Sequence, residues 1–295
     1  MPHTDKHNAF ALAQKADELF DAEHYEEALA LYTEAIQFAP NEADFYLNRG
    51  LVYDYLERYQ EAITDYTHAI HLDPQLSDSY NNRGRVYSFL EEYQKALTDL
   101  NQAIELDTKN DDYYNNRGLA YYYLDQYENA IADYNKAIAF NPNEADYYNN
   151  RGLTYHYNEQ FEAALADYSK AIQLSQDEAE YYNNRGEVYA ELEAYTEAIA
   201  DFSKAIELNP EEPEFYNSRG NVTDPENYLD AIADYTKAIA LNPNEAEYYN
   251  NRGETYSLLK NYHKARDDFE KAKNLNPTEP IYSKNFSKVT KLLSK

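Results

Sequence analysis

The sequence predicts an all-α solenoid, an array of helix hairpins stacked one after another. An Arg-Gly pair returns seven times, at intervals of 34 residues except for a last interval of 33, and it accounts for all seven glycines of the chain. Between these pairs, apolar residues recur at steps of three and four, which is the spacing of one face of an α-helix. Repetition at a fixed period of about 20 to 50 residues is typical of solenoid proteins.

The period divides residues 9–279 into eight units, each predicted to fold as a hairpin of two helices. The units comprise residues 9–42, 43–76, 77–110, 111–144, 145–178, 179–212, 213–245 and 246–279. Residues 1–8 are polar and are expected to be disordered or frayed. Residues 280–295 leave the repeat but keep an apolar stripe, so we expect a C-terminal helix that caps the last hairpin. Because this segment carries lysines and no acid, a basic docking or export tail is the alternative.

Each element of a unit has its own signal, with positions counted from the first residue of the unit so that the glycine is at position 8. The first helix is expected from about position 2 to 14, with tyrosines recurring at positions 4 and 11, and the second from about position 18 to 30. Position 17 is aromatic and position 20 is alanine in all eight units. The small alanine allows neighbouring helices to approach closely. Proline at position 32 in six units ends the second helix, because it lacks an N–H and has a fixed φ.

This order of aromatic residues, alanines and proline resembles the tetratricopeptide repeat family over residues 9–279. The resemblance implies a right-handed αα superhelix of antiparallel helix pairs. It also implies that the first helices line a concave groove and that the second helices lie outside. A protein or peptide is the partner that such a groove implies.

One departure from the family pattern concerns charged residues. Units two to eight carry Arg at position 7, where the family usually has Leu, and Asp at position 23, whereas unit one has Lys15 and Leu31 instead. This joint presence and absence predicts that the two side chains meet as a ladder of ion pairs between helices, because a half-buried guanidinium needs a carboxylate partner. The alternative is that both are solvated surface charges. The ladder residues of the central units are Arg83, Asp99, Arg117, Asp133, Arg151 and Asp167.

The seventh unit is one residue short, and its first helix is predicted to end early, near residues 221–227. Asp224 as N-cap and Pro225 at the first helical position would start the second helix early. A break in the groove that serves function is one interpretation, and a tolerated deletion in a turn is the other.

Positions 2, 5, 6, 9, 12 and 13 lie on one face of the first helix, and in the family this face lines the groove. Asparagine recurs at position 6, and an amide offers both a donor and an acceptor to the backbone of an extended peptide. Bridging between adjacent units explains the asparagines equally well. Aromatic residues at positions 12 and 13 could anchor apolar side chains of a ligand. The candidate groove residues are Asn48, Asn82, Asn116, Asn150, Asn184, Asn251, Asp78, Asp112, Asp146, Tyr55, Arg85, Phe89, Tyr122, Tyr123, His156 and Tyr157.

The charge of the chain restricts the partners. With 54 acidic and 26 basic residues the formal net charge is −28, which repels nucleic acid and anionic membrane surfaces. Some members of the family bind an acidic C-terminus through a clamp of Lys, Asn and Arg, but only Arg85 supplies a suitable cation in this groove. A neutral or basic partner segment is therefore expected.

The sequence predicts neither a membrane span nor a secretory signal, because no stretch approaches about 18 consecutive apolar residues and the N-terminus lacks an apolar core. A soluble protein, cytoplasmic by default and monomeric by default, is the expectation. No metal or other cofactor is predicted, since His3 with His7 and His68 with His71 lack further suitable ligands.

No catalytic residues are predicted, since every glycine is already assigned to the repeat and no phosphate loop or nucleophile elbow remains. The leading hypothesis is a non-enzymatic scaffold or adaptor that binds an extended neutral or basic segment in its groove. The alternative is a regulatory or targeting subunit of an enzyme or a secretion assembly, docking through the convex face or the irregular seventh unit. A catalytic protein with a hidden carboxylate site is the third possibility.

Overall fold

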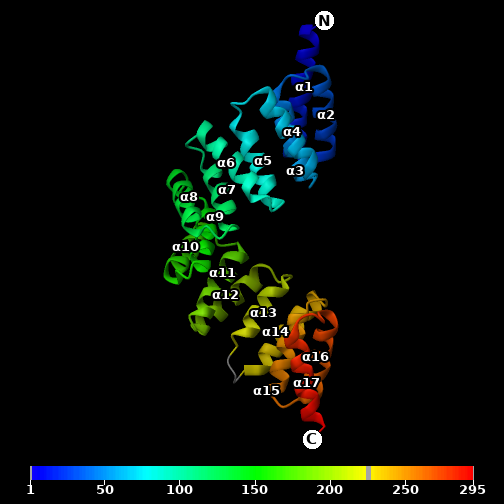
Figure 1. Ribbon diagram of the computed structural model, residues 1–295, viewed down its shortest axis with the longest axis vertical. Coiled ribbons are helices and arrows are strands. Elements are labelled where there is room, and N and C mark those ends of the chain that lie inside the picture. Colours follow the sequence, from blue (N-terminus) through cyan, green and yellow to red (C-terminus); the bar gives the residue numbers. More distant parts are fainter. Residues whose placement is uncertain (1, 224–226, 295) are drawn as a thin grey trace. The chain divides into compact units, whose positions relative to one another are not determined.

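The structure of the chain, a computed structural model, describes residues 2–223 and 227–294 (Figure 1). The chain divides into two compact units, an N-terminal unit of residues 1–154 and a C-terminal unit of residues 155–295, with the division inside helix α9. Each unit is described by itself. The described residues form helices and contain no strand, so the predicted all-α class is confirmed.

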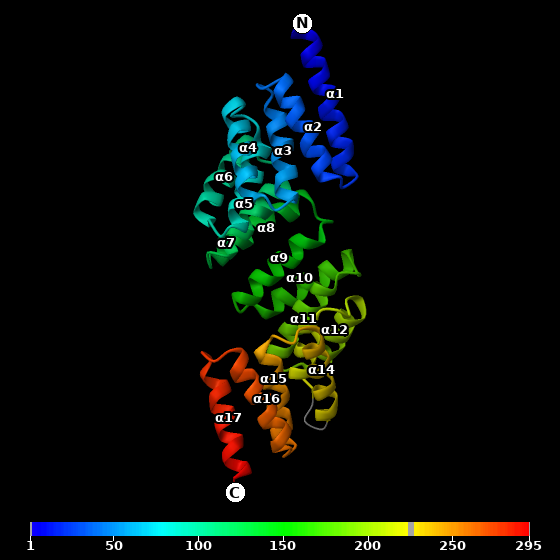
Figure 2. The ribbon, with the colours of Figure 1, turned by 90° about the vertical axis from the view of Figure 1, so that its right-hand side faces the viewer.

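The N-terminal unit consists of helices that pack in chain order, each on the next, from α1 on α2 to α7 on α8 (Figure 2). Contacts between every second helix also occur, for example between α3, α5 and α7. This packing of sequence neighbours is the pattern of a solenoid. The helices are α1 (Pro2–Asp21), α2 (Tyr25–Phe38), α3 (Ala43–Tyr55), α4 (Tyr59–Leu72), α5 (Ser77–Phe89), α6 (Tyr93–Leu106), α7 (Asp111–Tyr122), α8 (Tyr127–Phe140) and α9 (Ala145–Tyr157).

The C-terminal unit repeats this arrangement, with packing in chain order from α10 on α11 to α16 on α17. The last helix also contacts α15 and buries Tyr282 and Val289. The helices are α10 (Phe161–Leu174), α11 (Ala179–Glu191), α12 (Tyr195–Leu208), α13 (Pro213–Asn221), α14 (Tyr228–Leu241), α15 (Ala246–Leu258), α16 (Tyr262–Leu275) and α17 (Pro280–Leu293).

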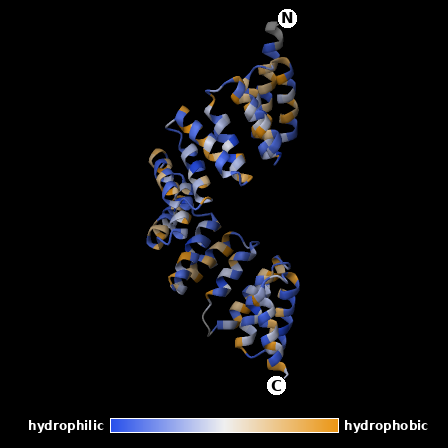
Figure 3. Cartoon of the chain, in the orientation of Figure 1, coloured by the Kyte–Doolittle hydropathy of each residue, from blue (hydrophilic) through white to orange (hydrophobic). Residues whose placement is uncertain are grey.

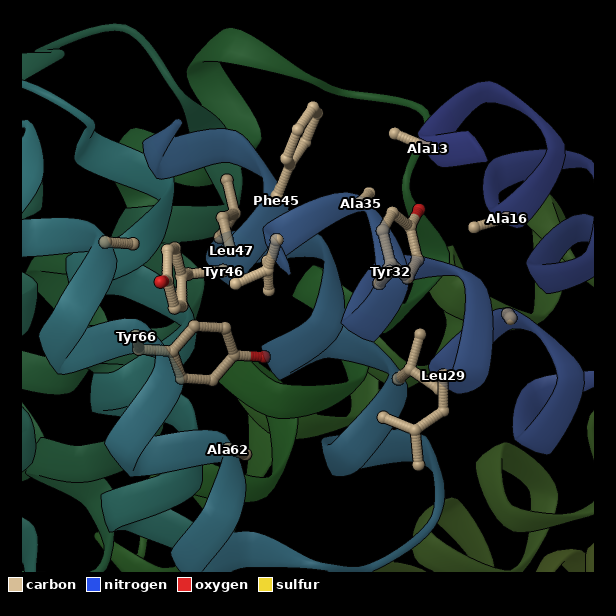
Figure 4. Packing of buried hydrophobic residues seen from close by; sticks show 14 of the residues in the cluster. Ala13, Ala16, Leu29, Tyr32, Ala35, Phe45, Tyr46, Leu47, Ala62 and Tyr66 are labelled. Carbon is tan, nitrogen blue, oxygen red and sulfur yellow. The ribbon is translucent and has the colours of Figure 1, made fainter. Parts of the chain in front are cut away.

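The core of both units is built from the repeated alanines and the large rings beside them. The helices carry both hydrophobic and hydrophilic residues, as helices that bury one face require (Figure 3). In the first hairpins, Tyr32, Phe45 and Tyr66 are almost completely buried (Figure 4). Ala35 and Ala62, which are wholly buried, let the helices around these rings approach closely.

The N-terminus differs from the sequence prediction. Residues 1–8 were expected to be disordered or frayed, but residues 2–8 belong to α1. Two contacts hold this end of the helix: Lys6 Nζ lies 2.5 Å from Glu42 Oε1, and it also lies 5.6 Å from the centre of the Phe10 ring. A charge–charge and a cation–π contact of this kind stabilise a helix end that carries few apolar side chains. Met1 lies outside the described residues.

The seventh unit has a short first helix, as the sequence predicted. Helix α13 spans 9 residues, compared with 13 in α11. Its second helix, α14, begins at Tyr228, the aromatic residue with which the second helices of the other units also begin. The expected N-cap Asp224 and the expected first helical residue Pro225 lie outside the described residues.

Among the described residues, the turns of seven hairpins each contain a residue in the left-handed region, which the sequence analysis did not predict. After α5, the N–H of Glu91 donates to the carbonyl of Ser88 and the N–H of Glu92 donates to the carbonyl of Tyr87, the bonding of a Schellman motif. Glycine usually occupies the left-handed position of this motif, but here it is a charged residue. The residues with positive φ are Glu23, Glu57, Glu91, Asp125, Glu159, Glu193 and Lys260, with φ between 55° and 61°.

Glycine at one of these turns is expected to stabilise the protein. Glu91 has a φ of 61°, where a Cβ atom costs about 1 kcal/mol, so Glu91→Gly should raise the free energy of unfolding by up to about 1 kcal/mol in urea denaturation. Glu92→Gly is the matched control, because Glu92 has an ordinary φ of −87°. A loss of stability in Glu91→Gly as large as that in Glu92→Gly would contradict this account.

Candidate functional site

The structure brings the arginines of position 7 and the aspartates of position 23 together as two-pronged ion pairs. In the fourth unit, Arg117 Nε lies 2.6 Å from Asp133 Oδ2, and Arg117 Nη2 lies 2.7 Å from Asp133 Oδ1. Asp133 is only 4% exposed, so these are not solvated surface charges. Of the predicted fifth pair, Arg151 lies in the N-terminal compact unit of residues 1–154 and Asp167 lies in the C-terminal compact unit of residues 155–295. The same pairing links Arg49–Asp65, Arg83–Asp99, Arg117–Asp133, Arg185–Asp201, Arg219–Asp234 and Arg252–Asp268.

Each arginine also reaches the preceding unit, a contact that the sequence analysis missed. Arg117 Nη1 donates to Asn101 Oδ1 at 2.6 Å. The available signal was a Ser, Thr or Asn sixteen residues before every one of these arginines. Burial disfavours the charged form of Arg117, but the hydrogen bonds and charge of Asp133 outweigh it and raise the pKa of the guanidinium. The acceptors in order are Thr33, Thr67, Asn101, Asn135, Ser169, Ser203 and Thr236.

The asparagines of position 6 bridge neighbouring units, which is the second of the two interpretations of their recurrence. Asn116 Nδ2 donates to Asn81 Oδ1 at 2.9 Å, and Asn150 Nδ2 donates to Asn115 Oδ1 at 3.1 Å. Each amide still has a second N–H and an oxygen, so bridging does not exhaust its capacity. Of the other predicted residues, Asn48 donates to Asp17, Asn82 accepts from Asn81, Asn251 donates to Asn217, and Asn184 is buried.

The acidic residues of position 2 also join neighbouring units. Tyr113 donates its hydroxyl to Asp78 Oδ1 at 2.5 Å, and Tyr147 donates to Asp112 Oδ1 at 2.7 Å. Asp78, Asp112 and Asp146 are exposed, so their charge still faces solvent. Asp78 and Asp112 therefore stabilise the stacking of neighbouring repeat units. The exposed carboxylates of position 2 also give the surface of the protein a negative electrostatic potential.

Three exposed rings of position 13, on α3, α5 and the residue after α7, form what we call the aromatic row: Tyr55, Phe89 and Tyr123. Their exposed fractions are 55%, 67% and 53%. Each packs on the ring that begins the second helix of the preceding unit, with centroid distances of 5.3 Å for Tyr25–Tyr55, 4.6 Å for Tyr59–Phe89 and 5.3 Å for Tyr93–Tyr123. Tyr157, the next predicted ring, is 58% exposed, and Tyr122 is half-buried with its edge toward Tyr123.

A hollow of about 300 Å³ lies between two members of the aromatic row. It is lined by Phe89 and Tyr123 together with Arg85, Asn116 and Leu119. Arg85, the expected groove cation, is paired with Asp54 at 2.5 Å between Nη2 and Oδ2. Four predicted groove residues, Arg85, Phe89, Asn116 and Tyr123, therefore line one hollow together with Leu119. The positive charge of Arg85 is already neutralised by Asp54.

In the C-terminal unit, α11 carries glutamates on this face, Glu187 at position 9 and Glu191 at position 13. His156, expected as part of an aromatic pocket, has a side chain only 10% exposed, with Nε2 2.9 Å from Glu191 Oε1. Burial raises the pKa of Glu187, and the hydrogen bond donated by Asn183 opposes this shift. His156 therefore contacts the carboxylate of Glu191 and is not an exposed ring that could bind a ligand side chain. Glu191 stands at position 13, where the second to fifth units have an aromatic residue.

Within the described residues, no group of three or more His, Cys, Asp or Glu side chains is arranged to hold a metal ion. His68 and His71 are exposed on α4, and the ring of His68 stacks on Tyr46 at 4.5 Å. No helix in the described part of the chain is long and apolar enough to cross a bilayer.

Comparison with protein-family models finds tetratricopeptide repeats along most of the chain. Models described as tetratricopeptide repeat match residues 43–76, 179–212 and 246–279, and residues 65–98. A model described as TPR repeat matches residues 16–54, 90–125, 120–159, 155–193 and 226–260. A search of curated proteins finds no similar sequence.

Solved structures with the same fold are numerous. The Cut9–Hcn1 hetero-tetramer of APC/C superposes with a TM-score of 0.68 at 17% identity, covering 94% of this chain and 55% of that chain. PilF of Pseudomonas aeruginosa gives a TM-score of 0.64 at 20% identity, covering 72% of this chain and 97% of its own. YrrB, described as a TPR protein with an unusual peptide-binding site, gives 0.50 at 23% identity, covering 61% and 92%.

Proposed function

Because this chain belongs to the tetratricopeptide repeat family, and is thus a scaffold for protein–protein interaction, we propose that it binds an extended, neutral or basic segment of a partner protein. The segment lies along the groove face of the first helices, over the aromatic row of the N-terminal unit. The proposal assigns no catalytic residue.

The exposure of the aromatic row carries this proposal. Three large rings of one repeat position are each more than half exposed on α3, α5 and the end of α7, whereas the rings of position 24, such as Tyr66 and Tyr134, are fully buried. Contiguous exposed apolar surface of this kind marks binding sites. The rings are already held by stacking on Tyr25, Tyr59 and Tyr93, so little side-chain entropy remains to be lost when a ligand packs between them.

The charge around the aromatic row sets the preference of the partner. Asp78 and Asp112 are exposed on the same helices, and Arg85 is neutralised by Asp54. An acidic segment would meet repulsion without a free cation to compensate, whereas a basic segment would meet complementary potential. Raising the salt concentration should weaken the binding of such a segment.

A peptide selection tests the proposal directly. Peptides of twelve residues are selected from a random displayed library on the intact protein, and their dissociation constants are measured for the protein and for Phe89→Ala/Tyr123→Ala. Because central aromatic anchors dominate binding energy, the double variant should bind at least about tenfold more weakly.

The matched control is Phe140→Ala, which removes a ring of similar exposure, 46%, from the second helix α8. It should leave the affinity unchanged. Selected peptides that are predominantly acidic, or that bind the double variant as tightly as the original protein, would contradict the proposal.

Docking through a second helix is the alternative function, and one observation favours it. Leu229, near the start of α14 in the short seventh unit, is 75% exposed, more than any ring of the aromatic row. A regulatory or targeting subunit that docks there would lose its partner in Leu229→Ala and would keep it in Phe89→Ala/Tyr123→Ala.

A further inference from the structure

Two hydrogen bonds recur where one unit follows another. The first runs from a tyrosine at position 3 to the acid at position 2 of the preceding unit, and the second runs from the asparagine at position 6 to the amide oxygen of position 5 in the preceding unit. The first is made by Tyr113 to Asp78, Tyr147 to Asp112 and Tyr248 to Glu214, at 2.5 to 3.0 Å. The second is made by Asn116 to Asn81, Asn150 to Asn115, Asn251 to Asn217 and Asn285 to Asn250, at 2.9 to 3.1 Å.

The junction between α11 and α13 lacks both donors. Position 3 of α13 is Phe215, which has no hydroxyl, and position 6 is Ser218, whose side chain is shorter than that of asparagine. The acceptors remain. Asn183 is 7% exposed and its Oδ1 has no hydrogen-bond partner, and Glu180 is exposed at position 2 of the sixth unit. A buried carbonyl oxygen without a donor is costly, so its retention is informative.

Both acceptors line a hollow of about 510 Å³ in the C-terminal unit. Glu214 contributes a third acceptor, and although it accepts hydrogen bonds from Tyr248 and Asn217, a carboxylate has further lone pairs. The other charged residues of the lining are Asp177, Glu178 and Glu212, and the lining contains no basic residue. The hollow therefore combines an orphaned amide oxygen with a strongly negative potential.

We propose that this hollow is a subsite for a lysine side chain of the partner. The ε-ammonium group has three donors and no acceptor, which matches the carbonyl oxygen of Asn183 and the carboxylates of Glu180 and Glu214. The ligand supplies the two donors that the junctions onto units four, five and eight have and that this junction lacks. The subsite rests on the proposed binding of a basic partner and identifies one side chain of that partner.

The chain itself provides the variants that test the subsite. Phe215→Tyr/Ser218→Asn introduces the residues that units four, five, six and eight carry at these positions, so it should fold, and it leaves the net charge unchanged, so nonspecific attraction of cations stays the same. The probes are N-acetyl-lysine methylamide and its uncharged analogue N-acetyl-norleucine methylamide. Their binding is followed by the NMR shift of the Asn183 side-chain amide.

The lysine probe should shift the Asn183 amide, and the norleucine probe should not. In the restored variant the dissociation constant of the lysine probe should rise at least about tenfold, because its donors now compete with the tyrosine hydroxyl and the asparagine amide that the two substitutions introduce. The restored variant should also melt at a higher temperature, since the orphaned oxygen gains a donor. Glu180→Gln is a second variant, with an exposed side chain and little risk to folding, and it should weaken the binding of the lysine probe as well.

Equal affinity of the lysine probe for the protein and the restored variant would overturn the subsite, as would a lysine probe that leaves Asn183 unshifted. These results are separate from the test of the proposed function. If selected peptides still depend on Phe89 and Tyr123, the proposed function stands without the lysine subsite. If only the lysine probe binds, the subsite stands and the aromatic row loses its assigned role.

Discussion

Asp133→Ala should lower the free energy of unfolding by about 3 kcal/mol, because it leaves the Arg117 guanidinium half-buried without its carboxylate. The side chain of Arg117 is only 16% exposed, and two of its nitrogens donate to Asp133 at 2.6 and 2.7 Å. The other contacts of the guanidinium, a hydrogen bond to Asn101 and the rings of Tyr114 and Tyr121, carry no negative charge and cannot neutralise it. Urea denaturation followed by circular dichroism measures the change.

Two controls distinguish the cost of leaving a buried guanidinium unpaired from the cost of losing an ion pair as such. Glu61→Ala removes the partner of Arg58 from an exposed pair, with side chains 46% and 42% exposed, and should cost less than about 1 kcal/mol. Replacing both members, as Arg117→Leu/Asp133→Leu, should recover much of the stability lost in Asp133→Ala, since no unpaired charge remains. Equal costs for Asp133→Ala and Glu61→Ala would show that the pair is effectively solvated.

Phe202→Ala should lower the free energy of unfolding by about 4 kcal/mol, the largest loss expected from a single core substitution here. Phe202 is 1% exposed on α12 and packs directly on Gly186 of α11, where an added Cβ atom would lie 2.8 Å from the ring. Removal of the ring would leave a cavity. Because α11 meets the ring at Gly186, which has no side chain, this position of α11 cannot fill that cavity. Thermal and urea unfolding should show the loss.

The third unit supplies the control for this substitution. Leu100 occupies the corresponding position and lies beneath Gly84 in the same way. Phe202→Leu should therefore be accommodated at a cost of less than about 1.5 kcal/mol. If Phe202→Ala were no more damaging than Phe202→Leu, the ring would not fill the space between the helices as described.

The sequence predicted the hairpins well because the signals for them are local. The start of a second helix at an aromatic residue and its end before proline depend on a few adjacent residues, and the structure places α2 from Tyr25 to Phe38, just before Pro40. The pairing of Arg117 with Asp133 was also predicted, since both residues appear and disappear together among the units. The left-handed turn at Glu91 was not predicted, because glutamate gives no hint of the positive φ that the closing hydrogen bonds impose.

The candidate site was only partly predictable. The exposed rings of Phe89 and Tyr123 followed from their place on the helix face, and the structure gathers them around one hollow. The role of Asn116 remained open between binding and bridging, because that choice depends on whether Asn81, 35 residues earlier, lies within 2.9 Å. His156 was assigned to the wrong environment for the same reason, since its neighbour Glu191 is 35 residues away in the chain.

The sequence by itself determined the helices, their order and the faces that they bury, because period, glycine and proline act within one hairpin. The tertiary structure decided which polar groups are satisfied, because each donor and its acceptor stand on different hairpins. In the sequence, Ser218 is visible as an interruption of the asparagine series at position 6, but nothing indicates its consequence. Only the stacking of α13 beside α11 shows that Ser218 and Phe215 leave the oxygen of Asn183 without a donor and an acidic hollow open beside it.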